Sequence, residues 1–116
     1  MASMTVKVAK DNTEAVESTF QRAILTALEE CGLVGEAYAV ANITIMDAVD
    51  TGRLRGSITH GVDNAEKVAY IGTNVEYAAY VEFGTSKMPA RPYLKNAVND
   101  HMDEYRDIIK TRLENA

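Results

Sequence analysis

The chain has 116 residues, of which 47% are hydrophobic and 25% are charged, and its formal net charge is -5. This size and balance predict one soluble globular domain spanning residues 1–116. The acidic total counts against a general nucleic-acid binder, because such proteins are usually basic and neutralise phosphates. The single cysteine, Cys31, excludes an intrachain disulfide and a zinc site built from several cysteines.

The sequence shows no signal peptide at its start and no run of roughly 18 apolar residues that could span a membrane. A lone cysteine fits assembly in the cytosol. Met4 offers a second start, so residues 1–3 are either native or added ahead of the native chain, and the sequence leaves both open.

Residues 4–9 alternate apolar and polar side chains and predict a short strand. Asp11 and Glu14 then have the spacing of a helix capping box. Apolar residues recur at steps of three and four from Val16 to Ile45, which predicts one long helix, bent or briefly broken near Gly32.

A helix of about 35 residues would be about 50 Å long, whereas a compact domain of this size has a radius of gyration of about 13 Å. We therefore expect the helix either to break near residues 31–35 or to extend beyond its own domain and pack on a neighbour. Between residues 11 and 36 it carries six acids and one base, Arg22, which indicates either a solvated face or an acidic docking surface.

Asp50, Thr51 and Gly52 have the chemistry of a turn that ends this helix. Residues 53–60 alternate like a half-buried strand, residues 61–66 are mostly polar, and residues 67–73 read as a returning strand. The pattern predicts a β-hairpin over about residues 53–73.

Residues 75–83 predict a short amphipathic helix, with Gly84 just past its end. Pro92 suits the first turn of a last helix, and an apolar stripe continues from Leu94 to Leu113. The predicted fold class is α+β, with a long N-terminal helix and a C-terminal helix packed on a small antiparallel sheet.

No catalytic, cofactor-binding or metal-binding set is expected. His60 and His101 lie far apart in the sequence without metal-ligand spacing, and nothing positions Asp47 and Asp50 with His60 for acid–base chemistry. The glycines around residue 52 match no phosphate-binding pattern.

The distribution of charge along the chain bears on self-association. Residues 84–95 carry three bases, Lys87, Arg91 and Lys95, and no acid, whereas the first helix is acidic. Such a chain can bind copies of itself head to tail, and these contacts close into a ring where the rotation permits. Alternatively, both regions are merely solvated.

Two stretches together resemble the signatures of a known family. Residues 49–58 read Val-Asp-Thr-Gly-Arg-Leu-Arg-Gly-Ser-Ile, and residues 71–94 include Tyr-Ala-Ala-Tyr-Val-Glu-Phe-Gly-Thr-Ser-Lys-Met-Pro-Ala-Arg-Pro. Their order and spacing resemble the head–tail joining proteins (neck, tail-completion or minor tail components) of long-tailed double-stranded DNA phages and prophages. One departure is Ala48, where the family often has proline.

The resemblance implies a non-enzymatic structural protein of the virion, assembled in the host bacterial cytoplasm. It implies a homo-oligomeric ring, hexamer or dodecamer, between the head-closure or connector proteins and the tail tube or tail terminator. The genome would pass through the lumen without specific binding.

Within this picture, Thr51 and Gly52 are expected to turn the chain from the long helix into the hairpin, and Gly84 and Pro92 belong to the second signature. The aromatic side chains of the short helix either pack it on the sheet or lie at an interface. They are Tyr77, Tyr80 and Phe83. The candidates for contacts between subunits are Glu82, Lys87 and Arg91, with Tyr77 and Tyr80.

Two other functions stay open. One is a small oligomeric adaptor of bacterial origin without a virion role. The other is a DNA-binding accessory protein, which the acidic total disfavours. Its basic patch would be Arg53, Arg55, Lys87, Arg91 and Lys95.

Overall fold

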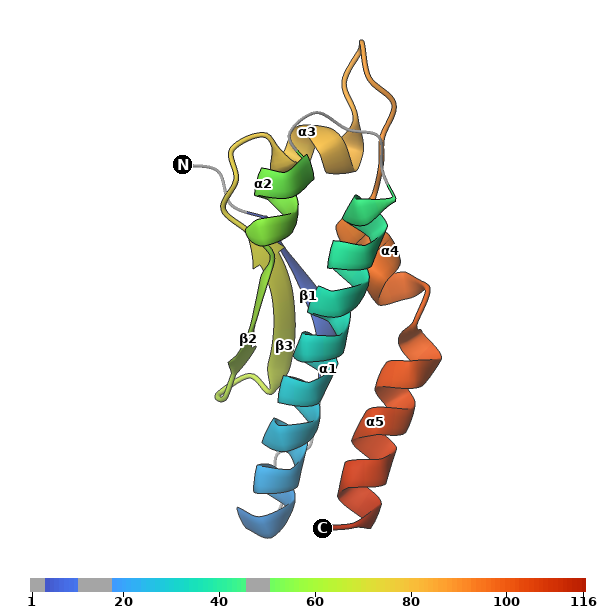
Figure 1. Ribbon diagram of the computed structural model, residues 1–116. Coiled ribbons are helices and arrows are strands. Elements are labelled where there is room, and N and C mark those ends of the chain that lie inside the picture. Colours follow the sequence, from blue (N-terminus) through green and yellow to red (C-terminus); the bar gives the residue numbers. More distant parts are fainter. Residues whose placement is uncertain (1–3, 11–17, 46–50) are drawn as a thin grey trace.

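The computed structural model describes residues 4–10, 18–45 and 51–116, so the capping box predicted at Asp11 and Glu14 lies outside the described residues, as do Asp47, Ala48 and Asp50. The fold is α+β, as the sequence predicts (Figure 1). Its elements in chain order are β1 (Met4–Lys10), α1 (Ser18–Thr44), α2 (Thr51–Gly56), β2 (Thr59–Asp63), β3 (Val68–Thr73), α3 (Ala78–Phe83), α4 (Tyr93–Asn99) and α5 (Met102–Glu114).

The strands form an antiparallel sheet in the order β1-β3-β2. Gly72 of β3 pairs with Thr5 on one side and with Thr59 on the other, so β3 is the central strand. Its side chains are almost all buried. The first predicted strand is confirmed as β1, which carries a bulge between Lys7 and Ala9.

Helix α1 is unbroken for 27 residues, so the expected break near Gly32 is wrong. At about 1.5 Å per residue it is about 40 Å long, and the molecule is correspondingly elongated, with extents of 51 × 26 × 22 Å. Figure 1 shows α1 running past the end of the sheet, where α5 of the same chain lies antiparallel beside it. The long helix is thus covered at that end by its own chain.

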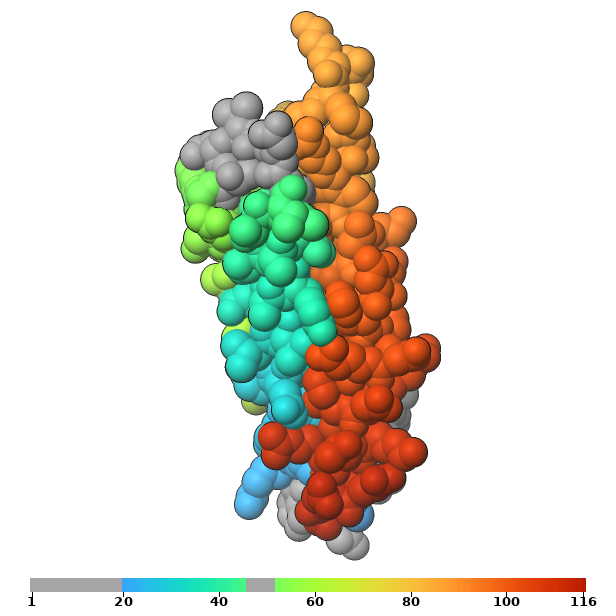
Figure 2. Space-filling model, turned by 45° about the vertical axis from the view of Figure 1, so that its right-hand side comes forward, coloured from blue at the N-terminus to red at the C-terminus, as the bar shows by residue number. Residues whose placement is uncertain are grey.

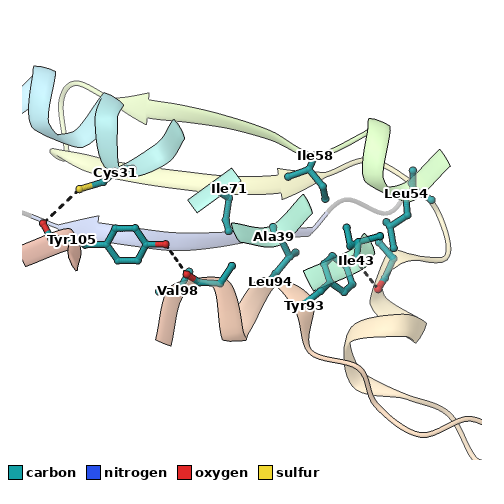
Figure 3. Packing of buried hydrophobic residues seen from close by; sticks show 14 of the residues in the cluster. Cys31, Ala39, Ile43, Leu54, Ile58, Ile71, Tyr93, Leu94, Val98 and Tyr105 are labelled. Atoms are coloured by element: carbon teal, nitrogen blue, oxygen red, sulfur yellow. Dashed lines mark hydrogen bonds between the residues drawn. The ribbon is translucent and has the colours of Figure 1, made fainter. Parts of the chain in front are cut away.

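The hydrophobic core lies between α1, the sheet and α4, and it continues along α5 (Figure 3). From α1, Ile24, Leu28, Ala39 and Ile43 are buried, whereas Ile45 is 85% exposed. The buried face of α1 is therefore rotated slightly from the predicted stripe. Tyr93 and Leu94 fill the core from α4.

The predicted hairpin is present but begins later than residue 53. Residues 51–56 form the short helix α2, and β2 starts only at Thr59. The alternation across residues 53–58 reflects Leu54 and Ile58 entering the core from a helical turn and from the segment after it. The predicted helix over 75–83 is confirmed with a later start, at Ala78.

The predicted C-terminal helix is divided into α4 and α5 around Asp100 and His101. In a continuous helix the Ala97 carbonyl would accept the amide of residue 101. Here the His101 amide donates to Val98 O at 3.4 Å, and the buried Tyr105 hydroxyl donates to Ala97 O at 2.6 Å. The tyrosine satisfies the carbonyl that the break leaves open, and α5 is free to follow α1.

Candidate functional site

The two signature stretches meet in space at one end of the sheet. Arg53 of α2 donates from both terminal nitrogens to the Glu76 carboxylate, at 2.8 and 2.9 Å, and its guanidinium carbon lies 5.6 Å from the centre of the Tyr77 ring. The hydrogen bonds from Arg53 lower the pKa of Glu76. Such paired geometry fixes the orientation of both side chains.

Hydroxyl groups complete this contact beneath the ion pair. Ser57 Oγ donates to Leu54 O at 2.6 Å and lies 2.5 Å from Thr73 Oγ1, which accepts the Val75 amide at 3.1 Å. Thr73 is buried, so this bonding satisfies a polar group that would otherwise be costly to bury. We call the set Arg53, Ser57, Thr73, Glu76 and Tyr77 the signature junction, and its role is to hold α2 against the end of β3.

Thr51 begins α2, and Gly52 follows it in the first turn of that helix. A Cβ at Gly52 would meet no atom within 4 Å. Both residues therefore lie in the short helix that precedes β2 and not in a tight turn.

Glu82 lies inside the subunit and is only 3% exposed. Its carboxylate oxygens accept the backbone amides of Leu94 at 2.9 Å and Lys95 at 3.1 Å, in the first turn of α4. Burial raises the pKa of Glu82, although both hydrogen bonds oppose that shift. In place of the expected contact between subunits, Glu82 caps α4 and ties it to α3, because free amides at a helix start attract a carboxylate.

The aromatic side chains of α3 divide between two environments. Tyr80 is 60% exposed and Phe83 is 72% exposed, whereas Ala78 and Val81 form the buried face of the helix. The expectation that Tyr80 and Phe83 pack α3 on the sheet is wrong, since their spacing places them together on the outer face. Tyr77 is half-buried beside Arg53 in the signature junction.

The segment after α3 forms a projecting tip, residues 84–90, at one end of the molecule (Figures 1 and 2). Thr85 and Met88 exchange backbone hydrogen bonds of 2.8 and 3.3 Å across a tight turn. Gly84 starts the tip with φ +77°, and a Cβ there would lie 2.6 Å from the Ala90 nitrogen. The requirement for glycine at position 84 is thus steric as well as conformational.

The predicted basic residues differ in their surroundings. Lys87 is exposed at the tip, Lys95 is exposed on α4, and Arg91 is half-buried where its amide donates to Val81 O at 2.8 Å. Pro92 comes directly before the first residue of α4. The five bases considered for a DNA-binding patch are distributed over α2, the tip and its base, and α4, and Arg53 among them is already paired with Glu76.

A histidine clamp between the sheet and α1 escaped sequence reasoning. His60 of β2 lies with Nε2 2.5 Å from Glu29 Oε1 and Nδ1 3.3 Å from Glu36 Oε1. Gly32 leaves room for the ring, because a Cβ there would be 2.9 Å from His60 Cδ2. Burial lowers the pKa of His60, but the hydrogen bonds and charges of both glutamates outweigh it and raise the pKa overall. The signal for this contact in the sequence was the pair Glu29 and Glu36, seven residues apart, with Gly32 between them.

A second feature that the sequence did not indicate is a groove of about 380 Å³ between α1 and α5. It contains Glu30, Glu104 and Asp107 and the partly buried Ile108. Thr111, Arg112 and Asn115 complete its lining. We call it the α1–α5 groove.

Among the residues that the structure describes, no group of three His, Cys, Asp or Glu side chains is placed to hold a metal ion. Cys31 is fully buried, and burial raises the pKa of its thiol to about 11, so it is not poised as a nucleophile. Within the described ranges, no helix is both long and apolar enough to cross a membrane.

Comparison with known proteins agrees with the resemblance described above. Residues 6–84, more than half of the chain, match the HK97-gp10-like family, described as "Bacteriophage HK97-gp10, putative tail-component". No curated protein and no solved structure matches significantly. The match runs from β1 to Gly84 and includes every residue of the signature junction. The chain belongs to the HK97-gp10-like family of bacteriophage tail components.

Proposed function

We propose that this chain is a non-enzymatic structural protein of the phage neck or tail top, where it forms a ring that joins the DNA-filled head to the tail. Family membership over residues 6–84 carries the proposal. The expected partners are further copies of the chain, head-closure or connector proteins, and tail tube or tail terminator proteins, brought together in the host bacterial cytoplasm.

The outer face of α3 supports self-association. Tyr80 and Phe83 are large, neighbouring and exposed, and they lie beside the projecting tip. Aromatic side chains are enriched in protein interfaces, and monomers rarely expose large contiguous apolar patches. A ring would bury this face against another subunit.

The overall charge supports passage of a genome through the ring. At a net charge of -5, the chain lacks the basic surplus that makes proteins hold DNA nonspecifically. A lumen of this character repels phosphates and lets DNA move past it.

The decisive experiment is deletion of the gene from the parent phage. We expect filled heads and separate tails in the lysate, seen by electron microscopy, and restored particles when the wild-type chain is supplied from a plasmid. Normal infectious particles without the protein would refute the proposal and favour an adaptor without a virion role.

Assembly of the purified chain is tested separately, by light scattering and negative-stain imaging. We expect closed rings, either of the chain alone or after addition of head-closure or tail-tube proteins. Open filaments or a monomer under all these conditions would contradict the ring.

A further inference from the structure

The projecting tip is closed and anchored by hydrogen bonds within its own chain. The Thr85–Met88 turn closes it, the Lys87 amide donates to Thr85 Oγ1 at 3.2 Å, and the Arg91 amide anchors its base to α3. A prearranged loop loses little conformational entropy on docking. The tip is therefore suited to insert into a partner.

The tip has a single charge. Lys87 is the only charged residue in positions 84–90, and its side chain is exposed. Among the residues whose side chains the structure describes, the Lys87 ammonium finds no ion-pair partner. The exposed Pro89 and Ala90 add apolar surface, whereas Met88 is partly buried against the core of its own subunit.

The α1–α5 groove has the complementary character. Of its three carboxylates, Glu30 pairs with Arg112 at 3.1 Å and Glu104 accepts the Tyr38 hydroxyl. Asp107 is exposed and has no ion-pair partner in the described part of the chain. With one guanidinium against three carboxylates, the groove is negative, and Ile108 gives it an apolar portion.

The tip projects at one end of a molecule 51 Å long, and α5, which supplies most of the groove's lining, lies towards the other end (Figure 1). One chain therefore cannot fill its own groove. A surface that fits a different surface of an identical subunit gives a head-to-tail contact, which generates a ring where the rotation between subunits closes.

We infer that the tip of one subunit docks in the α1–α5 groove of the next, with Lys87 beside Asp107 and Glu104, and with Pro89 against Ile108. The occupant is a second copy of this chain. The inference rests on the proposed ring and specifies which surfaces form it.

A charge-swap experiment tests the contact by sedimentation velocity over a concentration series. We expect Lys87→Glu and Asp107→Lys each to weaken self-association by on the order of 10- to 100-fold, since like charges would face each other across the contact. The double variant K87E/D107K restores opposite charges in every contact and should recover most of the association.

Matched controls change the same charges elsewhere. Lys95→Glu on α4 and Glu66→Lys on the hairpin turn alter exposed side chains outside both surfaces, and we expect wild-type association from each. Thermal melts of all variants show whether a loss of association is a loss of fold.

Cross-linking gives an independent readout. A K87C/T111C chain treated with a short bis-maleimide should yield a ladder of covalent multimers, because each subunit then links at both ends. K87C alone, T111C alone and K95C/T111C should yield dimers at most. Cys31 is buried and does not interfere.

The outcomes separate the docking contact from the ring. The docking contact is refuted, and the ring is not, if K87E and D107K assemble like the wild type. The same conclusion follows if the double variant fails to restore association while its thermal melt is unchanged. A wild-type chain that does not associate and a K87C/T111C chain that gives no ladder, together with normal particles after gene deletion, overturn both.

Discussion

Gly84 occupies a backbone conformation that only glycine adopts without strain. Its φ of +77° and ψ of 175° fall in a region closed to other residues, and Met88 O and the Ala90 nitrogen fill the space where a Cβ would be. This one residue therefore sets the direction in which the tip leaves α3.

We predict that Gly84→Ala lowers the free energy of unfolding by about 1–3 kcal/mol, through backbone strain and the clash with Ala90. Urea denaturation monitored by circular dichroism measures it. Gly52→Ala is the matched control, because a Cβ there meets nothing, and it should stabilise α2 by up to about 1 kcal/mol. Equal effects of the two changes would show that position 84 has no special requirement.

His60 makes the stability of the fold depend on pH. The pKa of His60 is raised in the folded state. The folded chain therefore binds the proton more tightly than the unfolded chain, in which the pKa of a histidine is about 6.5. The stabilisation is complete below that value and is lost as the pH rises through the folded pKa. We predict that the urea midpoint falls over this window in the wild type, and falls less in His60→Gln.

The control for this prediction is Glu66→Gln, which removes an exposed carboxylate far from the histidine and should keep the wild-type slope. Glu29→Gln should flatten the slope as His60→Gln does, since Glu29 is one cause of the raised pKa. Parallel curves for wild type and His60→Gln would mean that the clamp contributes nothing.

At the scale of single elements, α3 is the piece most exposed to a partner. Its buried face is small, made by Ala78, Val81 and the capping carboxylate of Glu82, while Tyr80 and Phe83 face outward. The helix is held to the rest of the fold by α4 and by the signature junction beside it, so its outer face is free to vary without loss of the fold.

We predict that Tyr80→Ser and Phe83→Ser each change the free energy of unfolding by less than about 0.5 kcal/mol but impair ring assembly. Val81→Ala should lower stability by about 1–3 kcal/mol, because it removes buried methyl groups. Chemical denaturation and sedimentation of the same samples separate the two effects. Strong destabilisation by Phe83→Ser would assign that ring to the core.

The elements with a clear period were predictable from sequence, and the exceptions have physical reasons. Strand β1 and helix α1 show sustained periods of 2 and 3.6, and β3 is a short, mostly apolar run that follows a polar turn. Helix α2 has six residues, two of which are glycine. Leu54 is the only buried residue among those of α2 whose burial is described, so the apolar pattern of this short helix was the same as that of a half-buried strand. The apolar stripe continues across the break between α4 and α5, so periodicity does not reveal the break. The Tyr105 hydroxyl stabilises it by donating to the Ala97 carbonyl.

The candidate site was only partly predictable. Lys87 and Gly84 stood out because bases without acids and a glycine after a helix are local signals. The role of Glu82 depends on amides 12 and 13 residues away, and that of His60 on helix residues 24 and 31 positions earlier. The α1–α5 groove exists only after α5 has folded back along α1. These features arise from tertiary contacts.

At the scale of the whole molecule, an elongated subunit carries a basic tip towards one end and an acidic groove towards the other. Attraction between such surfaces is partly electrostatic and is screened by salt. The Debye length falls from about 10 Å at 0.1 M salt to about 3 Å at 1 M.

We predict that raising NaCl from about 0.1 M to about 1 M weakens self-association, because screening removes the attraction of Lys87 for the groove. The swapped chain K87E/D107K should keep this salt dependence, whereas K87E alone should associate better as salt rises. Sedimentation velocity at several salt concentrations checks all three. Tighter wild-type association at high salt would instead indicate a contact dominated by the aromatic face of α3.

The placement of tip and groove at opposite ends also gives each subunit a polarity, and this makes the size of the ring countable without imaging it. A subunit with a disabled groove and a sound tip joins at one end and stops growth at the other. When such subunits are mixed with wild type, a closed ring survives only if every member is intact. The fraction of complete rings therefore falls as the wild-type fraction raised to the number of subunits. The slope of that titration on logarithmic axes distinguishes a hexamer from a dodecamer.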